Sequence, residues 1–271
     1  HMLLAHPDSA KTDLSHLKMT VGGSAMPVGL AEQAMARGIE VITGYGMSET
    51  APLMSVSHLS SAEMKLDPDS QARLRCLSGR APPLCELRIE APDGSELPHD
   101  GKAQGELTMQ APWLTQGYYK EPEQSERLWK GGWLHSGDIA TIDPRGMLVI
   151  RDRAKDVIKT GGEWISSLTL EDLISRHPGV AEVAVIAVHD AKWGERPLAL
   201  VVAAAGKAVE PEAIRARLHD AVQRGVIPDY GIPDQILLVK GLAKTSVGKL
   251  DKKVLRQTYG AMTERSSVAP A

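Results

Sequence analysis

Residues 44–50, with the sequence GYGMSET, combine side chains that could bind a nucleotide and its metal ion. Tyr45 lies between two glycines, so its ring face is open for stacking on a planar ligand. Ser48 and Glu49 place a hydroxyl beside a carboxylate, which suits a phosphate and its magnesium ion because magnesium prefers oxygen ligands. Taken alone, such a segment is more often an ordinary turn.

Two further segments carry candidate ligand groups. In residues 132–138 (GWLHSGD), Asp138 precedes a predicted strand and could accept both hydroxyls of a ribose, as carboxylates do in dinucleotide folds. In residues 152–166 (DRAKDVIKTGGEWIS), two glycines beside Trp164 would let a thin ligand pass close to the backbone. The alternatives are a turn aspartate for the first segment, and a solvated charge run followed by a turn for the second.

The fourth segment, residues 244–253 (KTSVGKLDKK), is a loop of small residues followed by basic ones. Lys249 comes directly after Gly248 and could place its ammonium group on a phosphate or a carboxylate. An exposed basic terminus explains the same pattern equally well.

Several generic motifs are excluded by single residues. Gly44 and Gly46 do not begin a dinucleotide fingerprint, because Glu49 occupies the position of the third glycine. Residues 241–249 are not a P-loop, because Leu250 replaces the Ser or Thr that would bind magnesium. Residues 22–26 lack the last glycine of a nucleophile elbow, and the histidines form no pair with helical zinc-site spacing.

The elements before residue 76 predict an α/β arrangement. Residues 1–20 are polar and irregular, and residues 22–27 form a glycine-rich loop that leads into a predicted helix over 28–37. A short apolar strand over 39–42 then runs into the segment with Tyr45. A glycine-bracketed loop at the end of an apolar strand is where α/β proteins place ligands.

The middle of the chain predicts a small sheet or barrel. Short stretches rich in β-forming residues are separated by turn clusters, and these stretches are 84–91, 104–111, 138–142 and 147–151. The charge-dense run over 151–156 follows them and reads as a hinge.

The region after the hinge predicts an α+β module. A helix is indicated by apolar spacing over 170–177, and Pro211 begins a second helix. The predicted strands and the terminal helix are 180–188, 196–204, 235–240 and 251–258.

The composition narrows the class of protein. The 271 residues include 31 Lys and Arg against 34 Asp and Glu, a net charge of −3 that argues against nucleic acid as the main partner. Two cysteines are too few for a disulfide scaffold, and the longest apolar run, residues 198–205, is too short to span a bilayer. No signal segment opens the chain, so we expect a cytoplasmic protein without a transmembrane segment. Phe and Asn are both absent.

Taken together and in this order, the four segments resemble the adenylate-forming superfamily of acyl-CoA synthetases, luciferases and adenylation domains. The resemblance covers residues 3–259. The sequence of residues 152–166, together with KWGERP at 192–197, is most similar to that of medium- and long-chain fatty acid–CoA ligases. It implies ATP, Mg²⁺ and CoA as cofactors or substrates. The reaction that the resemblance implies has two steps: a fatty acid would attack the α-phosphate of ATP to give an acyl-adenylate, and the thiol of CoA would then displace AMP.

The resemblance also implies residue roles. Nucleotide contacts fall to Gly23, Ser24, Ala25, Tyr45, Gly46, Met47, Asp138 and Arg153. Among these, Tyr45 would stack on adenine, while Asp138 and Arg153 would hold the ribose. The catalytic residues are Ser48 at a phosphate, Glu49 as the magnesium ligand, and Lys249, which would span the substrate carboxylate and the phosphate. Lys155 matches the hinge, and the CoA path takes in Gly162, Glu163 and Trp164.

The fold class implied is α/β and α+β. Residues 1–152 would be the truncated end of the large AMP-binding domain with a small β-subdomain, and residues 153–271 a complete, mobile α+β lid. The family's phosphate loop, which ends in Pro-Lys-Gly upstream of the Tyr45 segment, has no match here. We therefore expect the C-terminal portion of a longer ligase, inactive alone, with an exposed apolar face that favours a homo-oligomer. The alternatives are an adenylation domain of a peptide or polyketide synthetase, and a non-catalytic nucleotide- or CoA-binding module.

Overall fold

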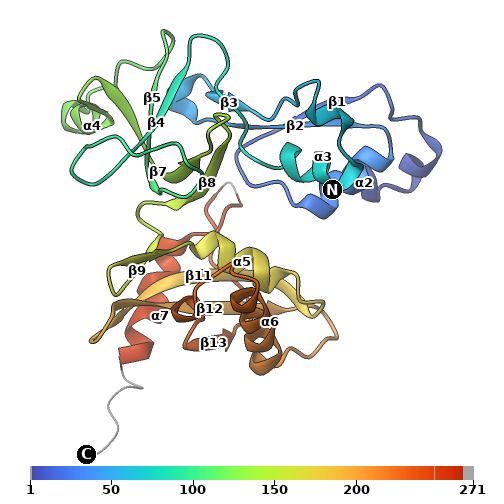
Figure 1. Ribbon diagram of the computed structural model, residues 1–271. Helices are drawn as coiled ribbons and strands as arrows, with labels where there is room; N and C mark the ends of the chain where they lie inside the picture. Colours follow the sequence, from blue (N-terminus) through green and yellow to red (C-terminus); the bar gives the residue numbers. More distant parts are fainter. Residues whose placement is uncertain (1, 247, 265–271) are drawn as a thin grey trace, which may run out of the picture. The chain divides into compact units, whose positions relative to one another are not determined.

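The computed structural model describes residues 2–246 and 248–264 and divides the chain into two units, residues 1–150 and 151–271 (Figure 1). The division falls two residues before the predicted one at 152/153. Each unit is mixed α/β in composition, and each is described here by itself.

The first unit opens with a three-stranded sheet. Strand β1 (Lys18–Val21) pairs in parallel with β2 (Glu40–Tyr45), and β3 (Ser55–Val56) pairs antiparallel with the end of β2. Helices α2 (Val28–Ala36) and α3 (Pro68–Arg75) pack beside this sheet. The short elements are α1 (Met2–Ala5) and the 3₁₀ turns η1 (Pro7–Lys11), η2 (Ser48–Thr50) and η3 (Glu63–Lys65).

The expectation that residues 1–20 are irregular is wrong for β1 and for the first two helical turns. Three of the four residues of β1 are exposed, so the strand lacks the apolar alternation that sequence patterns detect. The predicted helix over 28–37 is confirmed as α2, and the strand over 39–42 lies within β2 and the residue before it.

The rest of the first unit is a β-subdomain, defined as residues 84–150. Its sheet has the order β4-β5-β7-β6 with β8 paired to β7. The bounds are β4 (Glu86–Glu90), β5 (Gly105–Gln110), α4 (Pro122–Leu128), β6 (Trp129–Lys130), β7 (Trp133–Ile142) and β8 (Leu148–Arg153), which crosses the division. The core of the subdomain includes Ile89, Leu107, Met109 and Leu134, and it also takes in Met54 from the segment before β3.

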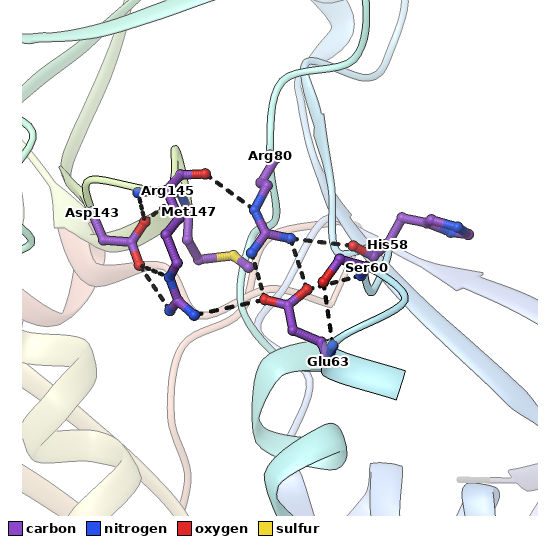
Figure 2. A network of polar contacts seen from close by, with 7 residues as sticks. All are labelled: His58, Ser60, Glu63, Arg80, Asp143, Arg145 and Met147. Carbon is purple, nitrogen blue, oxygen red and sulfur yellow. Dashed lines mark hydrogen bonds and ion pairs between the residues drawn. The ribbon is translucent and has the colours of Figure 1, made fainter. Parts of the chain in front are cut away.

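A polar network joins the β-subdomain to the segment around η3 (Figure 2). Arg80 donates to both carboxylate oxygens of Glu63, at 2.6 and 3.2 Å. Arg145, in the turn between β7 and β8, lies 3.8 Å from Glu63 and also pairs with Asp143 at 2.9 Å. The hydrogen bonds from Arg80 are the main reason that the pKa of Glu63 falls to about 2, with the backbone of Ser60 contributing next.

The second unit is a five-stranded sheet with helices on both faces. The order is β10-β9-β12-β11, with β13 parallel to β12. The bounds are β9 (Ile158–Thr160), β10 (Glu163–Ile165), α5 (Ser167–Ser175), β11 (Val180–Asp190), β12 (Gly194–Ala203), α6 (Pro211–Gln223), η4 (Asp229–Gly231), β13 (Gln235–Leu238) and α7 (Lys252–Glu264). Every predicted strand and helix after residue 166 is confirmed, although α7 continues to Glu264, beyond the predicted end at 258.

Alternating residues of β11 give the second unit two cores. Val183 and Val185 face a cluster with α5 and α6, while Ala184 and Ile186 face a cluster with Leu255 of α7. The β9–β10 hairpin was not predicted, because its three-residue strands are too short to show a pattern. Gly161 and Gly162 form its turn with φ of +59° and +89°, a conformation that favours glycine.

Candidate active site

The parallel pairing of β1 and β2 brings two candidate segments together. Because the carboxyl ends of parallel strands lie at one edge of a sheet, the loop after Val21 and the loop after Tyr45 are neighbours. A Cβ on Gly22 would lie 3.4 Å from the carbonyl oxygen of Gly44, which measures how closely the two loops approach. The structure thus brings the segment Gly23, Ser24 and Ala25 beside the segment with Tyr45.

The turn after Tyr45 is fixed by its own backbone. A Cβ on Gly46 would lie 1.6 Å from the carbonyl oxygen of Pro52, so only glycine fits there. The buried Thr50 hydroxyl accepts from the backbone N–H of Met47 and donates to the carbonyls of Met47 and Pro52. This bracing leaves Ser48 exposed and Glu49 half-exposed at the end of β2.

A β-bulge directs Asp138. The register between β5 and β7 shifts between Glu106 and Thr108, opposite residues 136–138, and Gly137 has a φ of +68°. Ser136 donates to the carbonyl of Leu107 and accepts from the N–H of Asp138. The expectation that Asp138 precedes a strand is therefore wrong, because it lies in the middle of β7. Glycine and polar residues at 135–138 do not resemble a strand in sequence, so β7 was not expected there. Its bulge sets the direction of the Asp138 carboxylate.

Two tyrosine hydroxyls form hydrogen bonds between the β2–η2 segment and the β-subdomain. Tyr45 of β2 donates to Oδ2 of Asp138 at 2.6 Å, and Asp138 is 4% exposed. Tyr118 of the β-subdomain donates to Oε1 of Glu49 at 2.5 Å. Each part therefore supplies a hydroxyl to the carboxylate of the other. The hydrogen bond to Glu49 is also the main reason that the pKa of Tyr118 rises to about 12.

The donor set at Glu49 fits a cation that arrives with phosphates. In residues 2–246 and 248–264, no three or more His, Cys, Asp or Glu side chains gather as a metal site. Magnesium is commonly held by one or two carboxylates together with substrate phosphates and water. Glu49, with Ser48 beside it, could contribute to a site of that kind.

In the second unit, three candidate residues are exposed at a strand end, in a turn and in a loop. Arg153 ends β8 and Lys155 follows in a turn, both exposed. Lys249 is exposed on a loop closed by backbone hydrogen bonds between Thr245 and Lys249 and between Asp251 and Ala243. Val247 lies outside the described residues.

The candidate CoA segment is the β9–β10 hairpin. Gly162 and Glu163 are exposed and Trp164 is half-buried. The N–H of Gly161 donates to the carbonyl of Trp193 at 2.8 Å, and a Cβ on Gly161 would lie 3.1 Å from the Trp193 ring. The turn is thus braced by the KWGERP segment.

The second unit also contains a buried charge cluster, which we define as Asp152, Ser167, Glu171 and Lys252. Lys252, 8% exposed, lies 2.7 Å from Glu171 and donates to Ser167 Oγ at 2.6 Å. Ser167 in turn donates to Asp152, which is 1% exposed, through both its hydroxyl and its N–H. Burial raises the pKa of Glu171, against the opposing effect of Lys252.

Within the first unit, the structure brings together Tyr45, Glu49, Asp138 and the glycine loop. Arg153, Lys155, Lys249 and the hairpin belong to the second unit. Sequence reasoning missed Tyr118 and the buried cluster. The available signal for Tyr118 was a pair of aromatic residues after Gly117, where a glycine-containing loop precedes Pro122.

Comparison with known proteins defines the class. The model of the AMP-binding enzyme family matches residues 1–119, and the model of the AMP-binding enzyme C-terminal domain matches residues 169–249. The chain belongs to the adenylate-forming superfamily.

Several curated relatives within this class are CoA ligases by name. The chain is 39% identical to a 3-methylmercaptopropionyl-CoA ligase of Ruegeria lacuscaerulensis, over 95% of this chain and 47% of the relative. It is 38% identical to a long-chain-fatty-acid–CoA ligase of Thermus thermophilus, over 89% of this chain and 44% of the relative. The chain thus spans about half the length of the curated relatives it matches.

Solved structures give the same fold. The amide bond synthetase McbA from Marinactinospora thermotolerans matches with a TM-score of 0.78 and 30% identity, over 95% of this chain and 50% of that one. No helix in the described part of the chain combines the length and apolarity needed to cross a membrane.

Proposed function

We propose that the chain is the part of an ATP-dependent fatty acid–CoA ligase that holds the adenylate and presents the mobile lysine. The observation that carries the proposal is the pair of crossed tyrosine–carboxylate hydrogen bonds at the carboxyl end of β2. They fix the carboxylates of Asp138 and Glu49 near the carboxyl end of β2, where a ribose, a phosphate and its cation would require them.

In the first half-reaction, an oxygen of the fatty acid carboxylate attacks the α-phosphorus of ATP and pyrophosphate leaves. Tyr45 would stack on adenine, and Asp138 would accept from the ribose hydroxyls. Magnesium, when bound, supplies charge neutralisation on the phosphates. Lys249 would bring a second cation to the reacting oxygens, because adenylyl transfer needs positioning and charge more than proton transfer.

In the second half-reaction, the CoA thiolate attacks the acyl carbon and AMP leaves with the bonding electrons of the acyl–oxygen bond. Gly162, Glu163 and Trp164 would line the path of the thiol. The exposed loop of Lys249 suits a residue that must leave before the thiol enters.

Nucleotide binding by the chain tests the first unit. We expect AMP to bind in calorimetry, and Tyr45→Ala and Asp138→Ala each to weaken AMP at least tenfold, about 1.4 kcal/mol or more. The control Tyr119→Ala removes a tyrosine that is 87% exposed, and it should leave the affinity unchanged. Equal affinity for all four proteins would contradict the site.

Acyl transfer tests the reaction. We expect the 271-residue chain to form no acyl-CoA from ATP, CoA and fatty acids of varied length, and turnover would contradict the fragment interpretation. In a ligase that joins this chain to a phosphate loop, Lys249→Ala should abolish adenylation and spare thioester formation from supplied acyl-adenylate. The same panel should include 3-methylmercaptopropionate, cinnamate and ferulate, the acids implied by the names of relatives.

A further inference from the structure

The loop over residues 115–118 is fastened to the η2 turn at one residue. The backbone N–H of Thr115 donates to the carbonyl of Glu49 at 3.0 Å. The hydroxyl of Tyr118 donates to Oε1 of the same residue at 2.5 Å. Both ends of this short loop therefore donate hydrogen bonds to Glu49. Thr115 donates to the backbone carbonyl of Glu49, and Tyr118 donates to its carboxylate.

Other residues of the β-subdomain hold this loop in place. Trp129 donates from its ring nitrogen to the carbonyl of Thr115 at 2.9 Å. The hydroxyl of Ser125, in α4, accepts from the N–H of Tyr118 at 2.8 Å. A Cβ on Gly117 would lie 2.7 Å from the Ser125 hydroxyl oxygen, so the loop packs tightly against α4. Tyr118 thus reaches Glu49 from a fixed support.

We infer that Tyr118 is a positioning residue that holds the Glu49 carboxylate ready for the cation of the bound nucleotide. The inference rests on the proposed function, in which Glu49 is that ligand. The hydroxyl occupies Oε1, and no described contact takes Oε2, so a cation could bind Oε2 with the tyrosine bond intact.

The physical reason is preorganisation. A half-exposed glutamate samples several rotamers, and a cation that binds it must first select one. A hydrogen bond from a fixed donor makes that selection in advance and keeps the second oxygen outward. Hydrogen-bond partners of this kind change metal affinity by roughly 10–100-fold when they are removed.

The test measures how much magnesium strengthens ATP binding. Calorimetric ATP affinities of the chain are taken in EDTA and in excess MgCl₂, for wild type, Tyr118→Phe, Glu49→Gln and the matched control Tyr119→Phe. We expect the magnesium-dependent gain to fall about tenfold in Tyr118→Phe and to be lost in Glu49→Gln. Affinity in EDTA, and the gain in Tyr119→Phe, should equal wild type.

Each other outcome is decisive. If the gain is lost in Glu49→Gln but is unchanged in Tyr118→Phe, the positioning role alone is overturned. The same holds if the gain is larger in Tyr118→Phe, because the hydroxyl would then compete with the cation. A gain that survives Glu49→Gln overturns the metal assignment in the proposed function. Weaker ATP binding by Tyr118→Phe in EDTA shows a merely structural role, and no gain in the wild type overturns both proposals.

Discussion

The two units hold their candidate residues in opposite ways. In the first, tyrosine hydroxyls fix Asp138 and Glu49, and strand β1 of the three-stranded sheet is mostly exposed. In the second, Lys249 and Lys155 are exposed on turns, while the strands beneath are packed on both faces. Under the proposed function, the nucleotide contacts of the first unit are held in place before the ligand binds. Under the same proposal, Lys249 must approach and leave the reacting atoms, which an exposed side chain on a well-packed unit allows.

The largest effect is expected in the second unit. Lys252→Met should lower its free energy of unfolding by about 3 kcal/mol, because Glu171 and Asp152 would then share a buried site without a cation. Urea unfolding followed through β11 and β12 amides would measure it. Lys253→Met changes an exposed neighbour and should stay within about 0.5 kcal/mol of wild type. Equal losses of unfolding free energy in both variants would show that the buried cluster does not stabilise this unit.

Hydrogen exchange compares the units directly. Residues 1–145 should exchange faster than residues 156–258, and β1 and β2 faster than β11 and β12 by about 100-fold. The reason is burial, since the described core around β1 and β2 has four buried side chains and that around α5 and α6 has sixteen. Uniform protection factors in hydrogen-exchange mass spectrometry would contradict the expected difference between the two units.

The Glu63 network predicts an acid-sensitive first unit. Because the pKa of Glu63 falls from 4.5 to about 2 on folding, its contribution is complete above about pH 4.5 and is lost as the pH falls toward 2. Glu63→Gln should cost about 3 kcal/mol at pH 7 and almost nothing near pH 2. Urea midpoints of both proteins across this range would measure it, and a pH-independent difference would contradict it.

Glu171 gives the second unit the opposite slope. Its pKa is raised by burial, so the native state binds the proton more tightly than the unfolded chain does. The contribution of Glu171 to stability should therefore grow as the pH falls toward the ordinary value of 4.5. Unfolding followed separately in each unit between pH 7 and 4.5 should show this rise. It would be absent if solvent reaches the cluster.

The smallest effect is expected at Lys249. Its side chain is exposed, so Lys249→Ala should change the stability of the second unit by no more than about 0.5 kcal/mol. A larger loss in urea unfolding would mean that the residue is part of the fold, which would weaken the contrast between the two units.

How much the sequence predicts differs along the chain. The long strands of the second unit were predictable because residues 183–188 and 198–203 are apolar on both faces, and the helices because their apolar spacing is regular. Strand β1 and the β9–β10 hairpin were not, because exposed or three-residue strands carry no alternation.

The site was predictable as segments and not as contacts. Tyr45 and Asp138 are 93 residues apart in the chain, and Tyr118 and Glu49 are 69 apart. No local pattern encodes a hydrogen bond over such a separation. The bulge that directs Asp138 depends on the register of β5 against β7, which only the folded sheet sets.

The crossed tyrosine bonds have a consequence for building hybrid enzymes. A β-subdomain transplanted from another protein would bring its own equivalents of Asp138 and Tyr118, while the recipient would keep Tyr45 and Glu49. A mismatch at one of the four leaves a carboxylate without its hydroxyl on the other side of the junction. The four positions are therefore best exchanged as a set, and a hybrid that folds well can still fail because this pairing was cut.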